Sequence, residues 1–300
     1  MKISVCIPVY NFDVRELVNS LSKEITNAEL NAEIILIDDS STKDFITINE
    51  PSKNVVNQFI FLEKNIGRSS IRNLFLKYTS GDFLLFLDCD AKIISENFLQ
   101  NYIDFISKNA NSTVIFGGRI PNDSVPPQKY ILRWNYSKFR ESQRNEIRKK
   151  NPYLSFQSNN FLIKRQLFEI HKFNEDLKQY GYEDLIFSLQ LKEKNIHINH
   201  IENTITNKDL ESNCIFLTKS EEAAKNLSFL YKSTNYKDLI SEIKLIKFYK
   251  TLKKYRLDKI FSLFFKINKF FLKYILIHKN VSLKFLDIYK LGLFIENVNV

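Results

Sequence analysis

The chain has 300 residues and a formal net charge of +10. Its length allows one large domain or a domain with an appendage. The three cysteines are scattered and form no CxxC pair, which argues against a disulfide framework or a zinc site and favours a reducing cytoplasm. No stretch approaches the roughly 18 uncharged apolar residues of a membrane span, and Pro8 interrupts the N-terminus too early for a signal peptide.

The first part of the chain alternates apolar runs with helical patterns. Strands are predicted at residues 2–9, 33–38, 57–62, 83–87 and 113–116. Helices are predicted at 13–28, from Ser69 to about Ser80 with Gly81 as C-terminal cap, and from an N-terminal cap at Ser95 through 106. This alternation predicts an α/β fold in which a mostly parallel central sheet is flanked by helices on both faces.

The pattern changes beyond residue 118. A polar, basic helix is predicted at about 129–150, followed by a strand at 160–163, a helix at 183–194 and a strand at 196–201. After residue 216 the pattern is helical throughout. The sequence therefore predicts one domain over 1–215, with two halves that meet near residue 118, and a helical C-terminal region over 216–300.

The most informative stretch is 83–90, where five apolar residues end in Asp88-Cys89-Asp90. Open α/β sheets bind ligands beyond the carboxyl ends of their strands, so acids at this position indicate a site. In an extended chain Asp88 and Asp90 share one face, and Cys89 points away. Their oxygens suit a divalent cation, and the alternatives are a calcium-stabilised turn and an Asx-turn.

Polar residues also follow the first two predicted strands. Tyr10 and Asn11 follow the first strand, and an aromatic ring beside an amide suits stacking on, and hydrogen bonding to, a nucleotide base. Asp38 and Asp39 follow the second, where one acid can accept a hydrogen bond from a ribose hydroxyl or a base. The alternatives are a plain strand end and a helix cap.

The segment 65–73 reads Asn-Ile-Gly-Arg-Ser-Ser-Ile-Arg-Asn. Gly67 permits a tight turn into a helix, and the free N–H groups at a helix N-terminus favour an anion. Arg68 and Arg72 lie one turn apart on one helical face, where guanidinium groups suit a diphosphate. The alternative is a solvated charged face.

Glu183 and Asp184 open a predicted helix after Tyr180-Gly181-Tyr182. Acids in the first turn complement the helix dipole, which is the structural interpretation. The functional interpretation is a general base at the mouth of a site.

These motifs, in this order, resemble those of the family 2 glycosyltransferases, which have the GT-A fold. The resemblance covers about residues 1–215 and implies a donor half over 1–118 and an acceptor half over 119–215. It implies that a metal ion, Mn²⁺ or Mg²⁺, binds Asp88 and Asp90, and that Asp184, beside Glu183, is the catalytic base. Donor contacts are implied for Pro8, Tyr10, Asn11, Asp39, Gly67, Arg68, Arg72 and Asp88.

The acceptor side is expected to include Trp134, Asn159, Asn160 and Tyr182. Asn159 and Asn160 lie in a segment similar to the acceptor-side strand of the family, whereas a lone Trp also fits simple packing. The chain departs from the family at Asn207, which stands where similar proteins often have a histidine that completes the metal or diphosphate site. The carbonyl oxygen of Asn207 could still serve as a weak metal ligand.

The resemblance implies that a sugar moves from a nucleotide-sugar, with UDP as the family expectation, to a hydroxyl of a saccharide or lipid-linked acceptor, with inversion. The expected context is synthesis of a cell-surface polysaccharide or glycolipid. The alternatives are a metal-dependent nucleotidyltransferase and a catalytically weak nucleotide-sugar-binding protein. A nucleotidyltransferase is expected to have a phosphate-binding loop after the first strand. The sequence Pro8-Val9-Tyr10-Asn11 is not such a loop.

The basic excess lies in the tail. Residues 237–290 hold 14 Lys or Arg and 4 Asp or Glu, a net of +10 that equals the total for the chain. This excess in an apolar helical tail, with no recognised nucleic-acid module, argues against nucleic acid as a partner. Lys266, Lys269 and Lys273 share a helical face, and a basic amphipathic helix is typical of an anionic membrane surface. A peripheral position on the inner face of the cell membrane is therefore one expectation. The other is a helical cap with solvated lysines.

Overall fold

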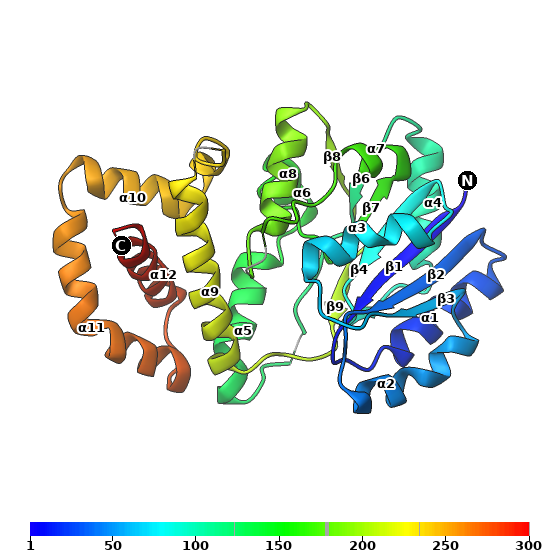
Figure 1. Ribbon diagram of the computed structural model, residues 1–300, viewed down its shortest axis with the longest axis horizontal. Helices are drawn as coiled ribbons and strands as arrows, with labels where there is room; N and C mark the ends of the chain where they lie inside the picture. Colours follow the sequence, from blue (N-terminus) through cyan, green and yellow to red (C-terminus); the bar gives the residue numbers. More distant parts are fainter. Residues whose placement is uncertain (123, 178–179, 234, 300) are drawn as a thin grey trace. The chain divides into compact units, whose positions relative to one another are not determined.

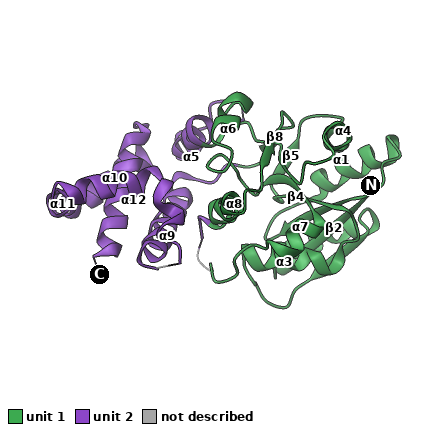
Figure 2. Cartoon of the chain, turned by 90° about the horizontal axis from the view of Figure 1, so that it is seen from above, with its two compact units in different colours: residues 1–121, 141–178, 183–209 green, residues 122–140, 179–182, 210–300 purple. Residues whose placement is uncertain are grey.

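The computed structural model describes residues 1–122, 124–177, 180–233 and 235–299. Two compact units make up the chain and are coloured separately in Figure 2. Unit 1 consists of residues 1–121, 141–178 and 183–209, and unit 2 consists of residues 122–140, 179–182 and 210–300. The division differs in detail from the predicted domain over 1–215, because its segments 122–140, 179–182 and 210–215 group with the C-terminal helices.

The strands of unit 1 form one large sheet and one small sheet. Their bounds are β1 Ile3–Val9, β2 Ala32–Asp38, β3 Gln58–Phe61, β4 Phe83–Leu87, β5 Ala91–Ile93, β6 Val114–Phe116, β7 Asn160–Lys164, β8 Ile198–His200 and β9 Ile205–Asn207. The large sheet has the order β3-β2-β1-β4-β7-β6-β8, and the small one pairs β5 with β9. Within the large sheet β7 runs antiparallel to both neighbours and the other pairs are parallel, which confirms the predicted mostly parallel sheet.

Helices cover both faces of the large sheet (Figure 1). Their bounds are α1 Arg15–Asn27, α2 Lys43–Asn49, α3 Arg68–Tyr78, α4 Phe98–Lys108, α6 Asn145–Lys150, α7 Arg165–Ile170 and α8 Glu183–Glu193, with a 3-10 turn at Glu50–Asn54. Alternation along β1 divides the core, since Val5 packs on the side of α1 and α4, whereas Cys6 packs on the side of α3 and α8. Strands buried on both faces explain why the sequence shows unbroken apolar runs.

Three local predictions are corrected. Ser95 does not cap α4, which begins at Phe98 after Asn97. Gly81 does not cap α3, which ends at Tyr78; glycine is required there because a Cβ would lie 2.6 Å from Oγ of Ser4. The predicted basic helix at 129–150 is broken into α5 and α6 by a π-helical turn, Ser137–Glu141, and a short non-helical stretch.

Unit 2 is helical, which confirms the predicted C-terminal helical region. Its helices are α5 Ile131–Tyr136, α9 Asn213–Lys232, α10 Lys244–Lys254, α11 Asp258–His278 and α12 Leu283–Val298, with 3-10 turns at Gln128–Tyr130 and Leu239–Glu242. Leu132 of α5 packs in one core with Leu217 of α9 and Tyr289 of α12, which explains why α5 belongs to this unit. Across the described residues, every helix is too short or too polar to cross a membrane.

Candidate active site

The carboxyl ends of β1, β2 and β4 meet at one edge of the large sheet. Val9 at the end of β1 pairs with Asp38 at the end of β2, and the N–H of Asp39 donates to the carbonyl oxygen of Val9 at 2.8 Å. Tyr10, which follows β1, is 53% exposed, so its ring is accessible from solvent. The fold therefore brings the predicted strand-end residues together.

Asn11 and Asp39 hold the loops of this edge. The side-chain carbonyl oxygen of Asn11 accepts a hydrogen bond from the N–H of Thr42 at 2.8 Å. The buried carboxylate of Asp39 accepts from the N–H of Ile66 at 2.7 Å and from that of Gly67 at 3.2 Å. Burial raises the pKa of Asp39, and these two N–H groups oppose the rise. The φ of +83° at Gly67 turns the chain into α3.

Two arginines of α3 reach acids on neighbouring elements. Nη2 of Arg72 lies 2.8 Å from Oδ1 of Asp88, and the Arg72 side chain is only 3% exposed. Nη1 of Arg68 lies 3.4 Å from Oε1 of Glu183, and the Arg68 side chain is 50% exposed. Arg72 therefore positions Asp88 from inside the protein, whereas Arg68 is accessible to a ligand.

Asp184 follows Glu183 in the first turn of α8 and is half-buried. Burial and the charge of Glu183 raise the pKa of Asp184 to about 7. The N–H of Leu185 and the guanidinium groups of Arg72 and Arg68 act in the opposite direction. A carboxylate that titrates near neutral pH has the property that a general base requires.

Residues 88–90 form a turn instead of continuing β4. The N–H of Ala91 donates to the carbonyl oxygen of Asp88 at 3.0 Å, so the extended geometry predicted for Asp88 and Asp90 is wrong. Cys89 lines a hollow beside α1. Burial, followed by the charges of Asp90 and Asp88, raises the pKa of the Cys89 thiol to about 12.

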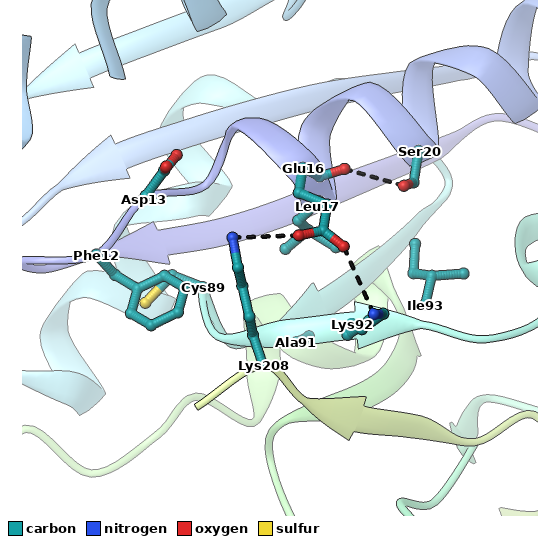
Figure 3. Close-up of a pocket in the computed structure, with 10 residues that line it drawn as sticks. All are labelled: Phe12, Asp13, Glu16, Leu17, Ser20, Cys89, Ala91, Lys92, Ile93 and Lys208. Atoms are coloured by element: carbon teal, nitrogen blue, oxygen red, sulfur yellow. Dashed lines mark hydrogen bonds and ion pairs between the residues drawn. The ribbon is translucent and has the colours of Figure 1, made fainter. Parts of the chain in front are cut away.

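The hollow beside α1 is drawn in Figure 3. It is lined by Phe12, Asp13, Glu16, Leu17, Ser20, Cys89, Ala91, Lys92, Ile93 and Lys208. The carboxylate of Glu16 lies 3.1 Å from Nζ of Lys208 and 3.8 Å from Nζ of Lys92 (Figure 3). Because both lysines already pair with Glu16, and Asp184 and Arg72 do not line the hollow, the candidate site is the sheet edge itself.

Asp90 is tied to β9 through Asn207. Asn207 pairs with Ala91 in the small sheet, and its side-chain nitrogen donates to Oδ2 of Asp90. Nη2 of the buried Arg119 donates to the side-chain Oδ1 of Asn207 at 2.5 Å, while Nη1 of Arg119 lies 3.0 Å from Oε2 of Glu141. Oδ1 of Asn207, which was predicted to be a weak metal ligand, points toward Arg119. Asn207 therefore does not fit that role.

Sequence reasoning missed Arg119 and Glu141. A signal was present for Arg119, since it follows Gly117-Gly118 at the end of a predicted strand, where a basic side chain can enter a site. Glu141 carried no such signal, because it lies in the stretch predicted as one continuous helix.

Three buried oxygens of the site have no hydrogen-bond partner among the described residues: Oδ2 of Asp38, Oδ1 of Asn159 and Oε2 of Glu183. Leaving a buried acceptor unpaired costs about 1–3 kcal/mol. A hydrogen-bond donor or a cation that bound each oxygen would remove this cost. Asn159 adjoins the metal candidates, because its carbonyl oxygen accepts from the N–H of Asp88 at 3.3 Å. Carboxylate and amide oxygens are the donor type that Mg²⁺ and Mn²⁺ prefer. Among the described residues, however, no three acids, cysteines or histidines lie together as a metal-binding group.

The prediction that Asn160 contacts the acceptor does not fit the structure. Asn160 is fully buried, and its side-chain oxygen accepts from the hydroxyl of Tyr102 at 2.7 Å. Its side-chain nitrogen donates to the carbonyl oxygens of Gly118 and Asn203 at 2.8 and 2.9 Å. Both the oxygen and the nitrogen of the Asn160 side chain are therefore engaged in bonds that join β7 to neighbouring segments.

Trp134 does not fit its predicted role as an acceptor platform. Its side chain is 5% exposed, and the indole N–H donates to the carbonyl oxygen of Asn122 at 2.8 Å within unit 2. The ring therefore serves packing, which was the alternative that the sequence left open. The acceptor roles of Asn159 and Tyr182 stay predictions.

Residues 4–170, more than half of the chain, match the family model described as Glycosyl transferase family 2. The poly(ribitol-phosphate) beta-N-acetylglucosaminyltransferase TarS of Staphylococcus aureus is 33% identical over 132 residues, which are 43% of this chain and 23% of TarS. The minor teichoic acid biosynthesis protein GgaB of Bacillus subtilis is 34% identical over 112 residues, which are 36% of this chain and 12% of GgaB. The matched part is less than a quarter of either relative.

Solved structures share the fold. The crystal structure of Staphylococcus aureus TarS superimposes with a TM-score of 0.53 at 22% identity, covering 83% of this chain and 44% of that chain. The mannosyltransferase PcManGT from Pyrobaculum calidifontis, solved with GDP-Man and Mn²⁺, superimposes with a TM-score of 0.55 at 10% identity, covering 99% of this chain and 85% of that chain. These likenesses confirm the predicted GT-A fold. The family model, which matches more than half of the chain, shows that the chain belongs to glycosyl transferase family 2.

Proposed function

We propose that the chain is an inverting glycosyltransferase that moves a sugar from a nucleoside-diphosphate sugar to an acceptor hydroxyl. The observation that carries the proposal is Asp184, whose pKa is raised to about 7 at the edge where the predicted donor residues meet. Asp184 takes the proton of the acceptor hydroxyl as that oxygen attacks the anomeric carbon, and the bond to the diphosphate breaks on the opposite face. A single displacement of this kind inverts the configuration.

Asp88 and Asp90 are proposed to hold Mn²⁺ or Mg²⁺ together with the donor diphosphate. Such ions are commonly bound by one or two carboxylates plus substrate phosphates, so a third protein acid is not needed. When bound, the ion would neutralise the charge that develops on the leaving nucleoside diphosphate. Arg72 keeps Asp88 in place and Asn207 keeps Asp90 in place.

The donor is proposed to lie along the loops after β1 and β2. The exposed ring of Tyr10 stacks on the base, and the acids after β2 accept from the base or ribose, with the unpaired Oδ2 of Asp38 available beside Asp39. Arg68 faces the diphosphate. We propose UDP as the nucleotide, because TarS was crystallised with UDP-GlcNAc.

The acceptor is proposed to be a saccharide or lipid-linked saccharide of the cell surface. The names of TarS and GgaB, which refer to poly(ribitol-phosphate) and teichoic acid, support this class. We also propose that the chain works in the cytoplasm, peripherally on the inner face of the membrane, through the basic residues 237–290.

A donor screen tests the proposal. Nucleoside-diphosphate sugars are expected to raise the melting temperature of the chain only when Mn²⁺ or Mg²⁺ is present. With an active donor and acceptor, proton NMR of the product is expected to show the anomeric configuration opposite to that of the donor. A product with retained configuration would overturn the inverting mechanism. Release of a sugar 1-phosphate instead of a nucleoside diphosphate would indicate transfer of the nucleotide, as in a nucleotidyltransferase.

A second candidate is a catalytically weak nucleotide-sugar-binding protein. The orientation of Asn207 favours it, because one potential metal ligand is lost. Binding of donor without transfer or hydrolysis, across all sugars tested, would establish this alternative.

A further inference from the structure

The outward face of α11 carries large apolar side chains that are exposed among the described residues of unit 2. These residues recur at the spacing of one helical face and are called here the apolar stripe: Ile260, Leu263, Phe264, Ile267, Phe270, Phe271 and Tyr274. Phe270 is 84% exposed and Ile267 is 73% exposed. Scattered exposed apolar residues are ordinary, but a continuous row of them marks an interaction surface.

The core of unit 2 does not need the stripe. Phe265, Leu272 and Leu276 of α11 are buried and pack with Leu286 and Tyr289 of α12. A surface helix normally has one apolar face, turned to the core. Helix α11 has a second apolar face, the stripe, which packs against no apolar surface among the described residues of unit 2.

The charges around the stripe indicate its partner. From Lys244 to Lys279 the chain has 11 Lys or Arg and one acid, Asp258. Lys259 and Lys266 are exposed, and helical spacing places them along one edge of the stripe. An apolar surface edged by cations matches a surface that is apolar inside and anionic at its boundary.

Two of the three lysines that the sequence placed on one face of this helix, Lys269 and Lys273, form ion pairs within unit 2. Nζ of Lys269 lies 2.7 Å from Oε2 of Glu296, and Nζ of Lys273 lies 2.9 Å from Oε1 of Glu221. Both lysines are therefore paired with acids of unit 2. The accessible feature of α11 is the stripe, with Lys259 and Lys266 beside it.

We infer that the apolar stripe enters the interfacial layer of an anionic lipid bilayer, so that α11 lies along the membrane surface. This inference rests on the proposed peripheral location and specifies how it is achieved. Exposed Tyr255 and Tyr274, near the two ends of the stripe, are of a type favoured at membrane interfaces. A second copy of the chain is a less suitable partner for the stripe. A symmetric contact between two stripes would bring Lys259 and Lys266 of both copies together.

The test is co-sedimentation of the full chain with vesicles of phosphatidylcholine alone or of phosphatidylcholine and phosphatidylglycerol in equal parts. The double variant Ile267→Glu/Phe270→Glu changes only exposed side chains and is expected to weaken binding to the anionic vesicles by at least about tenfold. Phe229→Glu, at a residue of α9 that is 59% exposed and outside the stripe, is the matched control and is expected to bind like the wild type. Unchanged binding of the double variant would overturn the inference.

Two further measurements separate this inference from the proposals on which it depends. If Lys259→Gln/Lys266→Gln abolishes binding and the stripe variant does not, the membrane location stands and the stripe insertion fails. If the wild type sediments with neither vesicle and analytical ultracentrifugation shows a dimer that the stripe variant dissociates, the partner is a second copy. Sugar transfer to a soluble acceptor, measured in parallel, reports on the enzyme independently of both outcomes.

Discussion

The sheet edge of unit 1 and the outward face of α11 in unit 2 depart from ordinary burial in opposite directions. At the sheet edge the side chains of Arg72 and Arg119 are 3% and 6% exposed, although they carry full charges. On α11, Phe270 is 84% exposed although it is apolar. Buried charges must be paired within the protein, whereas exposed apolar surface gains only from a partner outside it.

The two regions are therefore expected to respond differently to mutation. At the sheet edge, Arg72 and Arg119 pair with acids from inside the protein, so changing either is expected to disturb the site. The pair Lys273–Glu221 of unit 2 is more exposed, with side chains that are 43% and 22% exposed. Each such pair contributes little by itself.

The largest effect is expected from Asp184→Asn. Loss of a general base lowers turnover by about 10²- to 10⁴-fold, while the affinity for the nucleotide-sugar stays near that of the wild type. Transfer rates and donor binding by calorimetry, measured on the same preparation, check both parts. Asp104→Asn, at an exposed acid of α4, is the control and is expected to leave both unchanged. Turnover retained in Asp184→Asn would remove Asp184 from the mechanism.

The dependence of kcat/KM on pH should report the ionisation of Asp184. Because the pKa of Asp184 is raised to about 7, kcat/KM is expected to fall about tenfold per pH unit below 7, as the base becomes protonated. The residual activity of Asp184→Asn should lack this limb. A profile that stays flat down to pH 5 would contradict the assignment.

Stability should depend on the same ionisation with a defined sign. Folding raises the pKa of Asp184, so the native state binds a proton that the unfolded state releases between about pH 4 and pH 7. This contribution to stability is present below pH 4 and is lost as the pH rises through 7. Urea unfolding at pH 5 and pH 8 should therefore show a smaller fall for Asp184→Asn than for the wild type.

Local signals made the positions of the site acids predictable. An apolar run that ends in an acid marks a strand end, and this pattern is sufficient to place Asp39 and Asp88 at the carboxyl ends of β2 and β4. Their partners were not predictable, because they depend on the fold. The bond between Arg119 and Asn207 joins residues 88 apart in sequence, and no local pattern connects them.

In unit 2 the sequence predicted a basic amphipathic helix, but it did not show which of the apolar side chains of that helix are buried. Helical periodicity places Phe265 and Phe270 on different faces of α11, yet both faces are apolar. Only packing decides which face enters the core, and Phe265 does so against Tyr289. For the same reason the sequence could not show that α5 packs with α9, since a short helix fits either unit.

The next expected effect concerns stability. Arg72→Met leaves Asp88 without its ion-pair partner and is expected to lower the free energy of unfolding by about 2 kcal/mol, less than for a fully buried pair because Asp88 is 31% exposed. Lys273→Met in unit 2 breaks a more exposed pair and should cost about 1 kcal/mol or less. Urea unfolding of both variants checks the contrast. Equal losses would mean that the two regions do not differ in the way described.

The smallest expected effect is that of Asn207→Ala on metal binding. The amide of Asn207 donates to Asp90 and accepts from Arg119, so it positions Asp90 without offering oxygen to a cation. Its removal costs about one hydrogen bond to Asp90 and is expected to weaken Mn²⁺ binding, measured by calorimetry with UDP present, by about fivefold. Asp90→Ala, which removes a proposed ligand, should weaken it by at least about tenfold. If the two variants lost equal affinity, Asn207 would be acting as a direct ligand, and its amide would have to turn away from Arg119 when the ion binds.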